Sequence, residues 1–166
     1  MYTIGEKVVY GGHGVCLIAG IEERYVDRKT VSYFVLTPID RDQTQFFVPV
    51  HNPAALAKLR YPLTREELTQ LLRSPKLAED CWIPEDNRRK NRFKELINGG
   101  DFLAIAQMLH AVMEHRKKQL AAGKKFHICD ENFLRDAKRI LDSEISVVLG
   151  IPVNQVSETL ETLINE

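Results

Sequence analysis

Short apolar runs alternate with turn-forming residues along the first fifty positions of the chain. The runs, rich in Val, Ile, Tyr and Phe, are "EKVVYG", "GVCLIAGIEERYV", "TVSYFVLTPI" and "TQFFVPV". They are separated by "GGHG", "DRK" and "DRDQ", which are typical turn segments. Because these separations are too short for crossover helices, the pattern predicts antiparallel strands joined by hairpins. We expect a small antiparallel β-barrel over residues 1–62.

The spacing of apolar residues changes to a helical period from about residue 64. Thr64 and Glu67 form a capping-box pattern that predicts a short helix, and Ser74-Pro75 ends it. The segment "KLAEDCWIPED" is irregular and is the strongest local signal for a domain boundary, so we place a connector around residues 74–83. Pro84 is expected in the first turn of a helix containing "EDNRRKNRFKELI", which "NGG" ends.

Two longer helices follow. Asp101 is expected to cap the first, whose apolar stripe is Phe102, Ile105, Ala106, Leu109, Val112 and Met113. Asp130 is expected to cap the second, which Gly150 and Pro152 end, and a last helix starts near Val153. The predicted fold class is therefore α+β, with a β module over 1–62 and an all-α domain of about five helices over 63–166.

The formal net charge of zero hides an uneven distribution along the 166 residues. Residues 82–125 carry 10 Lys or Arg and 5 Asp or Glu, whereas residues 126–166 carry 3 and 8. A basic segment in a neutral chain is a candidate polyanion-binding face, and the alternative is a solvated helix surface balanced by the acidic tail. The three cysteines are odd in number and far apart, which favours reduced thiols in a cytoplasm.

The "GGHG" segment could be a phosphate loop, a metal site or a turn. No Gly-Lys-Ser/Thr follows it, and the next segment is a strand and not a helix, so we interpret it as a hairpin turn. His13 lacks ligand partners at zinc spacing, and His110 and His115 are five residues apart. We predict no metal site, no cofactor and no catalytic residues, and the sequence makes no positive case for an enzyme.

The basic residues fall into three groups that can converge on one face and neutralise phosphates. They are Arg88, Arg89, Lys90, Arg92 and Lys94; Lys117 and Lys118; and Lys124 and Lys125. For the second group, complementing the helix macrodipole is the alternative explanation. Trp82, the single tryptophan, can stack on or wedge against a base. Local sequence alone favours the alternative, in which Trp82 packs the connector onto the helical core.

The order and spacing of these segments resemble the CarD/CdnL family of bacterial transcription regulators. The matching segments are "IGEKVVYGGHGVCLIAGIEE", "YFVL", "VPV", Trp82, "NRRKNRFKEL", "FLRDAKRIL" and "EISVVLGI". The N-terminal module is similar to one shared with the transcription-repair coupling factor. The resemblance implies a Tudor-like barrel that binds the β subunit of RNA polymerase, with Arg24 as a contact. Phe47 stands where the family often has a second basic residue, so a contact there would be apolar or absent.

The resemblance also implies that the helical domain contacts the upstream edge of the melted promoter bubble, with Trp82 as a minor-groove wedge. Here Trp82 lies six residues before Arg88, a longer gap than the family pattern. Such a protein would be bacterial, cytoplasmic and nucleoid-associated, and would stabilise the open complex by binding it more tightly than the closed one. The alternatives are a stand-alone DNA-binding protein and a protein–protein adaptor without a DNA role.

Overall fold

The N-terminal runs form one antiparallel sheet in the computed structural model, which describes residues 1–41 and 43–165. The strands are β1 (Lys7–Tyr10), β2 (Val15–Val26), β3 (Lys29–Pro38), β4 (Phe46–Pro49) and β5 (Leu59–Arg60), in the order β4-β3-β2-β1-β5. A short helix, α1 (Pro53–Leu56), precedes β5. Within the described residues no ladder joins β4 to β5, so the sheet curls around its core without closing through hydrogen bonds. The core side chains are Val8, Cys16, Ile18, Phe34, Leu36 and Val48.

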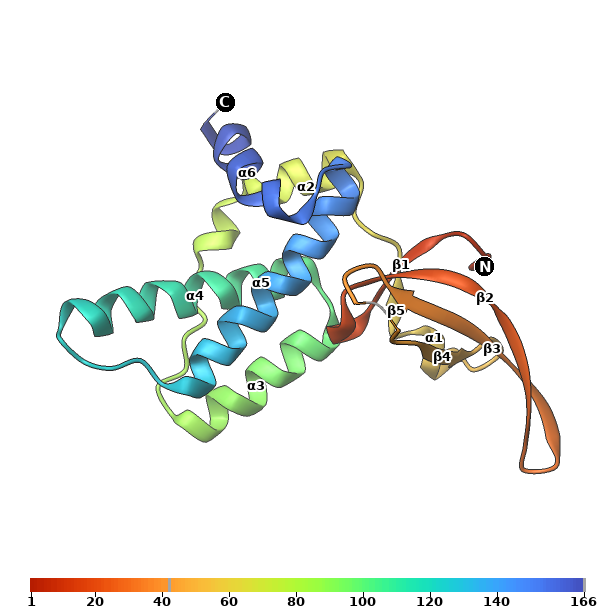
Figure 1. Ribbon diagram of the computed structural model, residues 1–166. Helices are drawn as coiled ribbons and strands as arrows, with labels where there is room; N and C mark the ends of the chain where they lie inside the picture. The colour runs from red at the N-terminus through yellow and green to blue at the C-terminus, as the bar shows by residue number, and fades with distance from the viewer. Residues whose placement is uncertain (42, 166) are drawn as a thin grey trace.

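The β2–β3 hairpin projects beyond this core as a two-stranded arm (Figure 1). Its predicted "DRK" turn is confirmed: Val26 pairs with Lys29, and Asp27 and Arg28 take φ angles of 49° and 64°. Both central residues have the positive φ of a tight hairpin turn. The distal half of β2 is exposed on the arm, which places Arg24 on accessible surface. Asp42, in the predicted "DRDQ" turn, lies outside the described residues.

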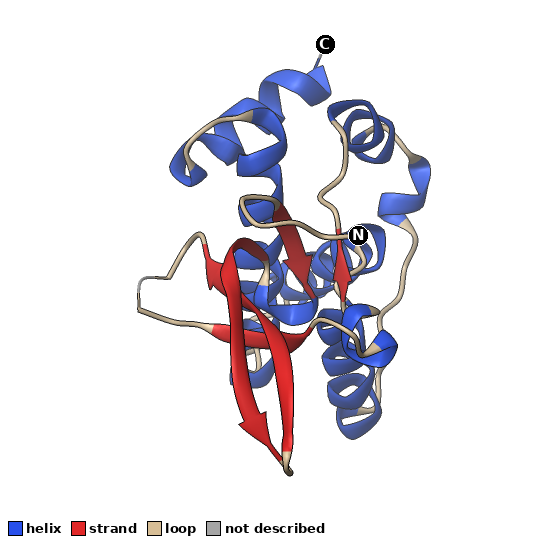
Figure 2. Ribbon diagram, turned by 90° about the vertical axis from the view of Figure 1, so that its right-hand side faces the viewer, coloured by secondary structure: helices blue, strands red, loops and turns tan. Residues whose placement is uncertain are grey.

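The second part of the chain is helical, which confirms the predicted α+β class (Figure 2). Its elements are α2 (Arg65–Leu72), η2 (Pro75–Ala78), α3 (Asp86–Gly99), α4 (Phe102–Ala121), α5 (Ile128–Leu149), η3 (Val153–Gln155) and α6 (Val156–Asn165). The Thr64–Glu67 capping box is present, and Asp101 caps α4 by accepting from the Ala104 N–H. Gly100 and Gly150 end α3 and α5 in the left-handed conformation, as predicted.

Three local predictions are wrong. Helix α5 begins two residues before Asp130, whose buried carboxylate is bound by Arg89 and does not cap the helix. Pro84 lies before the N-cap residue Glu85, outside the first turn of α3. In α4 Met113 is exposed, while Met108 and Ala111 join the buried stripe. The last error arises because α5, α3 and η2 all pack on α4 but leave the position of Met113 accessible.

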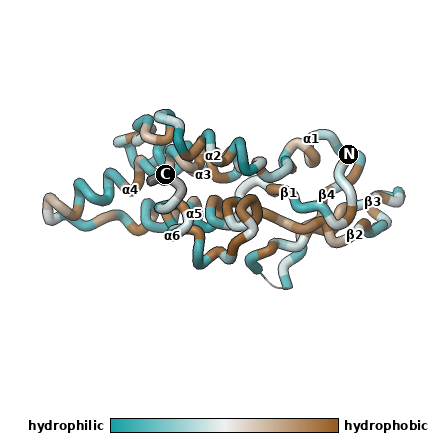
Figure 3. The backbone as a smooth tube through the Cα atoms, turned by 90° about the horizontal axis from the view of Figure 1, so that it is seen from above, coloured by the Kyte–Doolittle hydropathy of each residue, from teal (hydrophilic) through white to brown (hydrophobic). Residues whose placement is uncertain are grey.

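The connector between α2 and α3 lies inside the helical domain and is not a domain boundary. Cys81 and Trp82 pack on the same cluster as Leu68 of α2 and Phe93 of α3. The side-chain amide of Gln107 donates to the Lys76 carbonyl at 2.9 Å and ties η2 to α4. The hydropathy view shows apolar positions gathered where the helices face one another and within the sheet (Figure 3).

The glycine-rich turn between β1 and β2 is the point at which the two modules touch. It forms a short 3₁₀ turn, η1 (Gly11–His13), and β1 pairs with β2 across it, which confirms the predicted hairpin. Gly11 has φ +45°, and a Cβ on it would lie 2.7 Å from the Asn98 carbonyl oxygen of α3. A Cβ on Gly100 would lie 3.0 Å from Gly11. The glycines therefore allow two backbones to approach closely.

A charge pair between a partly exposed arginine and a buried glutamate joins the same two modules. The guanidinium of Arg60, on β5, donates to both carboxylate oxygens of Glu144 at 2.8 and 2.6 Å and to the Gly100 carbonyl. Glu144 is only 2% exposed and also accepts from the Leu63 N–H at 2.9 Å. Ser143 Oγ accepts from the Val15 N–H at 3.3 Å. These directional bonds set the orientation of the sheet relative to α5.

Candidate nucleic-acid and polymerase interfaces

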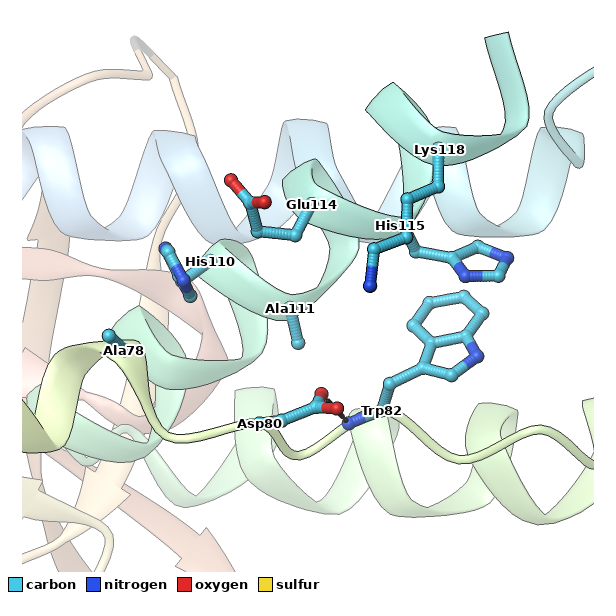
Figure 4. A pocket seen from close by; sticks show the side chains of 8 residues that line it. All are labelled: Ala78, Asp80, Trp82, His110, Ala111, Glu114, His115 and Lys118. Carbon is cyan, nitrogen blue, oxygen red and sulfur yellow. Dashed lines mark hydrogen bonds between the residues drawn. The ribbon is translucent and has the colours of Figure 1, made fainter. Parts of the chain in front are cut away.

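Trp82 is half-buried where the connector crosses α3 and α4. Its backbone N–H donates to Asp80 Oδ1 at 2.9 Å. Its indole stacks on the imidazole of His115, with ring centroids 3.7 Å apart and planes 16° apart (Figure 4). It also meets Phe93 edge-on at 6.3 Å. Trp82 therefore packs the connector onto the helical core while part of its side chain stays accessible.

Arg89 was predicted to contact DNA, and the structure gives it another role. Its side chain is 3% exposed and forms a two-pronged pair with Asp130, with both N–O distances at 2.9 Å. Its remaining donors bind Asp86 and the carbonyls of Ile83 and Pro84. A buried guanidinium with all its donors used is not available to a phosphate. Arg89 therefore leaves the candidate DNA-contacting set.

The other cations of α3 divide between two sides of the helix. Arg88 and Arg92, one turn apart, are exposed along a shallow groove with Asn91. Arg92 also pairs with Glu95 at 3.3 Å, a surface contact worth little in free energy. Lys90 lines a different pocket, together with Lys125 and His127 from the loop before α5. The tertiary structure thus brings together Lys90 and Lys125, which are predicted from separate segments.

The remaining predicted cations lie on exposed surface of the same domain. Lys118 lines the polar pocket beside Trp82, with His110, Glu114 and Asp80 (Figure 4). Lys117 pairs with Glu114 at 3.3 Å and stays largely exposed. Lys94 and Lys124 are exposed but line none of these three pockets.

Two pKa values around Trp82 are displaced by identifiable neighbours. Partial burial lowers the pKa of His115 below its ordinary value, and the positive charge of Arg89 adds to the effect. The hydrogen bond from Arg89 lowers the pKa of the Asp86 carboxyl. Both shifts favour a neutral imidazole on Trp82 and an ionised carboxylate on Arg89 near neutral pH.

On the sheet, the two residues singled out for polymerase binding contact each other. The Arg24 guanidinium carbon lies 3.9 Å from the centroid of the Phe47 ring. The register explains the contact, because Gly20 and Phe47 both pair with Val35 and Arg24 shares the face of Gly20. Arg24 and Phe47 therefore lie on one face of the sheet, two strands apart, with the guanidinium over the ring. No local sequence signal predicts the Arg24–Phe47 contact, because it depends on the register of β2 and β4 across β3.

The described residues form neither a metal centre nor a membrane span. In residues 1–41 and 43–165 there is no group of three or more His, Cys, Asp or Glu placed to hold a metal ion. The described helices also include none with the length and apolarity needed to cross a bilayer.

Comparisons with known proteins match both modules. Residues 2–60 match the CarD-like/TRCF RID domain, and residues 67–161 match the CarD C-terminal domain. The chain belongs to the CarD family. The family resemblance expected from the sequence is confirmed, and with it a transcription-associated role. A relative from Bacillus subtilis (strain 168), named "Putative transcription factor YdeB", is 25% identical over 169 residues, spanning 94% of this chain and 97% of the relative.

Within this CarD-family chain, the sequence identified Trp82 and several cations, but it did not predict which residues hold Trp82 in place. Arg89 of α3 and His115 of α4 contact the Trp82 ring, and Asp130 of α5 holds Arg89 in place. The sequence carried a local signal for Asp130 alone, because an aspartate in the first turn of a helix interacts favourably with the helix macrodipole. That Asp130 pairs with Arg89 could be found only from the tertiary structure.

Proposed function

We propose that this CarD-family protein binds the β subunit of RNA polymerase through its sheet and stabilises the promoter open complex through its helical domain. The observation that carries the proposal is the set of accessible cations that α3, α4 and the loop before α5 place on the helical domain, with Lys118 lining a pocket beside the half-buried Trp82. The set is carried on a body bonded directly to the sheet. The family membership supports a partner in the transcription machinery.

The polymerase contact uses the arm formed by β2 and β3. Arg24 has nearly half of its side chain exposed and is held over Phe47, so its charge is presented in a defined place. Phe47 gives the contact an apolar neighbour where a second cation is absent. A guanidinium lying on an aromatic face keeps its charge while losing little rotamer freedom on binding.

The DNA contact is to phosphates and needs no base-specific readout. Arg88, Lys90, Arg92, Lys118 and Lys125 are the cations best placed for it, with Lys94, Lys117 and Lys124 nearby in the same elements. The exposed part of Trp82 contacts the minor groove at the upstream edge of the bubble. Such contacts alone are weak and sensitive to salt, and tethering to polymerase supplies the effective concentration.

The mechanism is equilibrium binding, with no catalysis, metal or cofactor. A protein that binds the open complex more tightly than the closed one shifts the equilibrium by the ratio of the two affinities. The site of action is the bacterial nucleoid, in the cytoplasm.

The test measures the lifetime of open complexes after a competitor challenge. We expect the triple variant Arg88→Ala, Lys90→Ala, Lys125→Ala to shorten the lifetime that the wild-type protein produces, while polymerase pull-down is retained. The matched control is Arg65→Ala, Arg73→Ala, Lys76→Ala, which removes the same charge from exposed positions of α2 and its flanks. An unchanged lifetime in the first variant would instead identify an adaptor without a DNA role.

Two further measurements distinguish this proposal from the remaining alternative, a stand-alone DNA-binding protein. Arg24→Glu is expected to abolish polymerase pull-down without unfolding the exposed arm. In a gel shift without polymerase, the free protein is expected to bind weakly and without sequence preference. Tight, sequence-specific binding there would identify a stand-alone DNA-binding protein and overturn the proposal.

A further inference from the structure

A buried ion pair lies beneath the connector that carries Trp82. Arg89 and Asp130 are 2% and 1% exposed, and they join the first turn of α3 to the first turn of α5. All five N–H donors of the guanidinium are used: Nε and Nη2 bind the two Asp130 oxygens, Nη2 also binds Asp86, and Nη1 binds two backbone carbonyls. Replacing a buried pair by well-packed apolar residues often costs no stability, so stability alone does not account for this pair.

The arrangement specified here is the path of the connector. The two carbonyls that Arg89 binds belong to Ile83 and Pro84, the residues directly after Trp82, at 2.9 and 3.3 Å. On the other side, Asp80 accepts from the Trp82 N–H. The backbone is thus bonded on both sides of the tryptophan, and the indole has a defined direction.

Arg89 also contacts the ring itself. Its guanidinium carbon lies 4.3 Å from the Trp82 ring centroid, while His115 stacks on the indole at 3.7 Å. A planar guanidinium can lie on a ring and bind a carboxylate through a fork at the same time, whereas the ammonium of lysine cannot. The position therefore requires arginine and not simply a positive charge.

We infer that Arg89 and Asp130 are positioning residues that hold the Trp82 ring against His115 and so define the surface offered to a partner. This inference rests on the proposed function for its biological meaning, since DNA is the partner it would serve. Its structural part concerns the free protein alone. Neither residue touches DNA in this scheme.

The single tryptophan makes the inference directly measurable. In Arg89→Lys, which keeps the charge and loses the fork, we expect Trp82 emission to move to longer wavelength, acrylamide quenching to rise and the near-ultraviolet circular dichroism to weaken. Asp86→Ala removes only an exposed partner of Arg89, so it folds and is expected to give a smaller shift in the same direction. Unchanged emission and quenching in both variants would overturn the inference.

Two controls separate positioning from general destabilisation. Leu36→Val weakens the other hydrophobic core, that of the sheet, to which Trp82 does not belong, and is expected to leave the emission unchanged. Arg88→Lys changes the exposed neighbour of Arg89 and is expected to do the same. Emission shifts in these controls equal to that of Arg89→Lys would also overturn the inference.

The effect of this positioning on transcription is measured in a separate assay. With polymerase and promoter, Arg89→Lys is expected to shorten the open-complex lifetime about threefold while pull-down is retained. A shifted emission with an unchanged lifetime would leave the positioning role standing and would contradict the proposed contact of Trp82 with DNA. The two failures are thus distinguishable.

Discussion

Neighbouring cations in "NRRK" differ in burial, and the difference is set residue by residue. Arg88 is exposed along a groove, whereas Arg89 is buried with every donor used. Successive helical residues point about 100° apart, so a basic run on a helix cannot present all its charges to one partner. Which arginine turned inward depended on Asp130, forty-one positions later in the chain.

His115 is expected to make stability fall on mild acidification. Its folded pKa is lowered, so the unfolded chain binds the proton first as pH drops through about 6.5 and toward the folded value. The charged groups that face it are Arg89, Lys118, Asp80 and Asp130. Urea unfolding at several pH values from 7.5 to 5.5 should give a smaller decrease in the free energy of unfolding for His115→Gln than for wild type. Equal decreases would contradict the assignment.

The thiols are expected to differ in reactivity. Burial raises the pKa of Cys16 to about 12, so its reactive thiolate is scarce at neutral pH, while Cys129 is exposed. With a disulfide reagent at pH 8, mass spectrometry of the native protein should show Cys129 labelled first and Cys16 labelled only after unfolding. Native labelling of both at similar rates would show that the sheet core opens readily.

At the scale of elements, the turn between β1 and β2 has two tasks. Its glycines close a hairpin, which the local pattern predicted, and they also allow α3 to end against the turn. The same glycines serve both roles, so no separate sequence signal predicts the close approach of α3 to the turn. The capping box, the Asp101 cap and the C-terminal glycines were predictable because each involves residues within one turn of helix.

Gly11→Ala is expected to destabilise the protein by about 1–3 kcal/mol. The positive φ disfavours a side chain, and the new Cβ would collide with the Asn98 carbonyl, which belongs to backbone and cannot easily move. Gly20→Ala is the matched control, because no atom lies within 4 Å of its Cβ position. Chemical unfolding should separate the two variants, and equal stability would mean that the close approach does not exist in solution.

At the scale of the whole molecule, the two cores are joined by backbone contacts and charge-assisted hydrogen bonds. Arg60 reaches from the last strand to Glu144 in the C-terminal part of α5, and Arg139 of α5 reaches back to Asp40 at 3.2 Å. Such bonds are directional, so they hold an angle between the domains more firmly than an apolar contact would. A fixed angle matters if one module binds polymerase and the other binds DNA.

Glu144→Ala is expected to loosen this joint and to cost about 2–4 kcal/mol, because it strands Arg60 and the Leu63 N–H. Asp40→Ala, which removes a more exposed interdomain pair, is the control and should cost under about 1 kcal/mol. Urea unfolding gives the stabilities, and residual dipolar couplings report the interdomain angle. In the transcription assay, polymerase pull-down should persist while the open-complex lifetime shortens. An interdomain angle as well defined as in wild type would contradict this role.

The sequence by itself determined the fold class, most of the helix ends, the "GGHG" and "DRK" turns, the family and the cations of the basic segment. All of these depend on residues close together in the chain, where propensity, capping and periodicity act. Only the tertiary structure decided which arginine is buried, that Asp130 binds it and does not cap a helix, and that Lys90 shares a pocket with Lys125. Each of these depends on two segments meeting, and burial reverses the role of a charged group once its partner lies beside it. The second role of "GGHG", as a contact between the two modules, also depends on two distant segments meeting, so only the tertiary structure showed it.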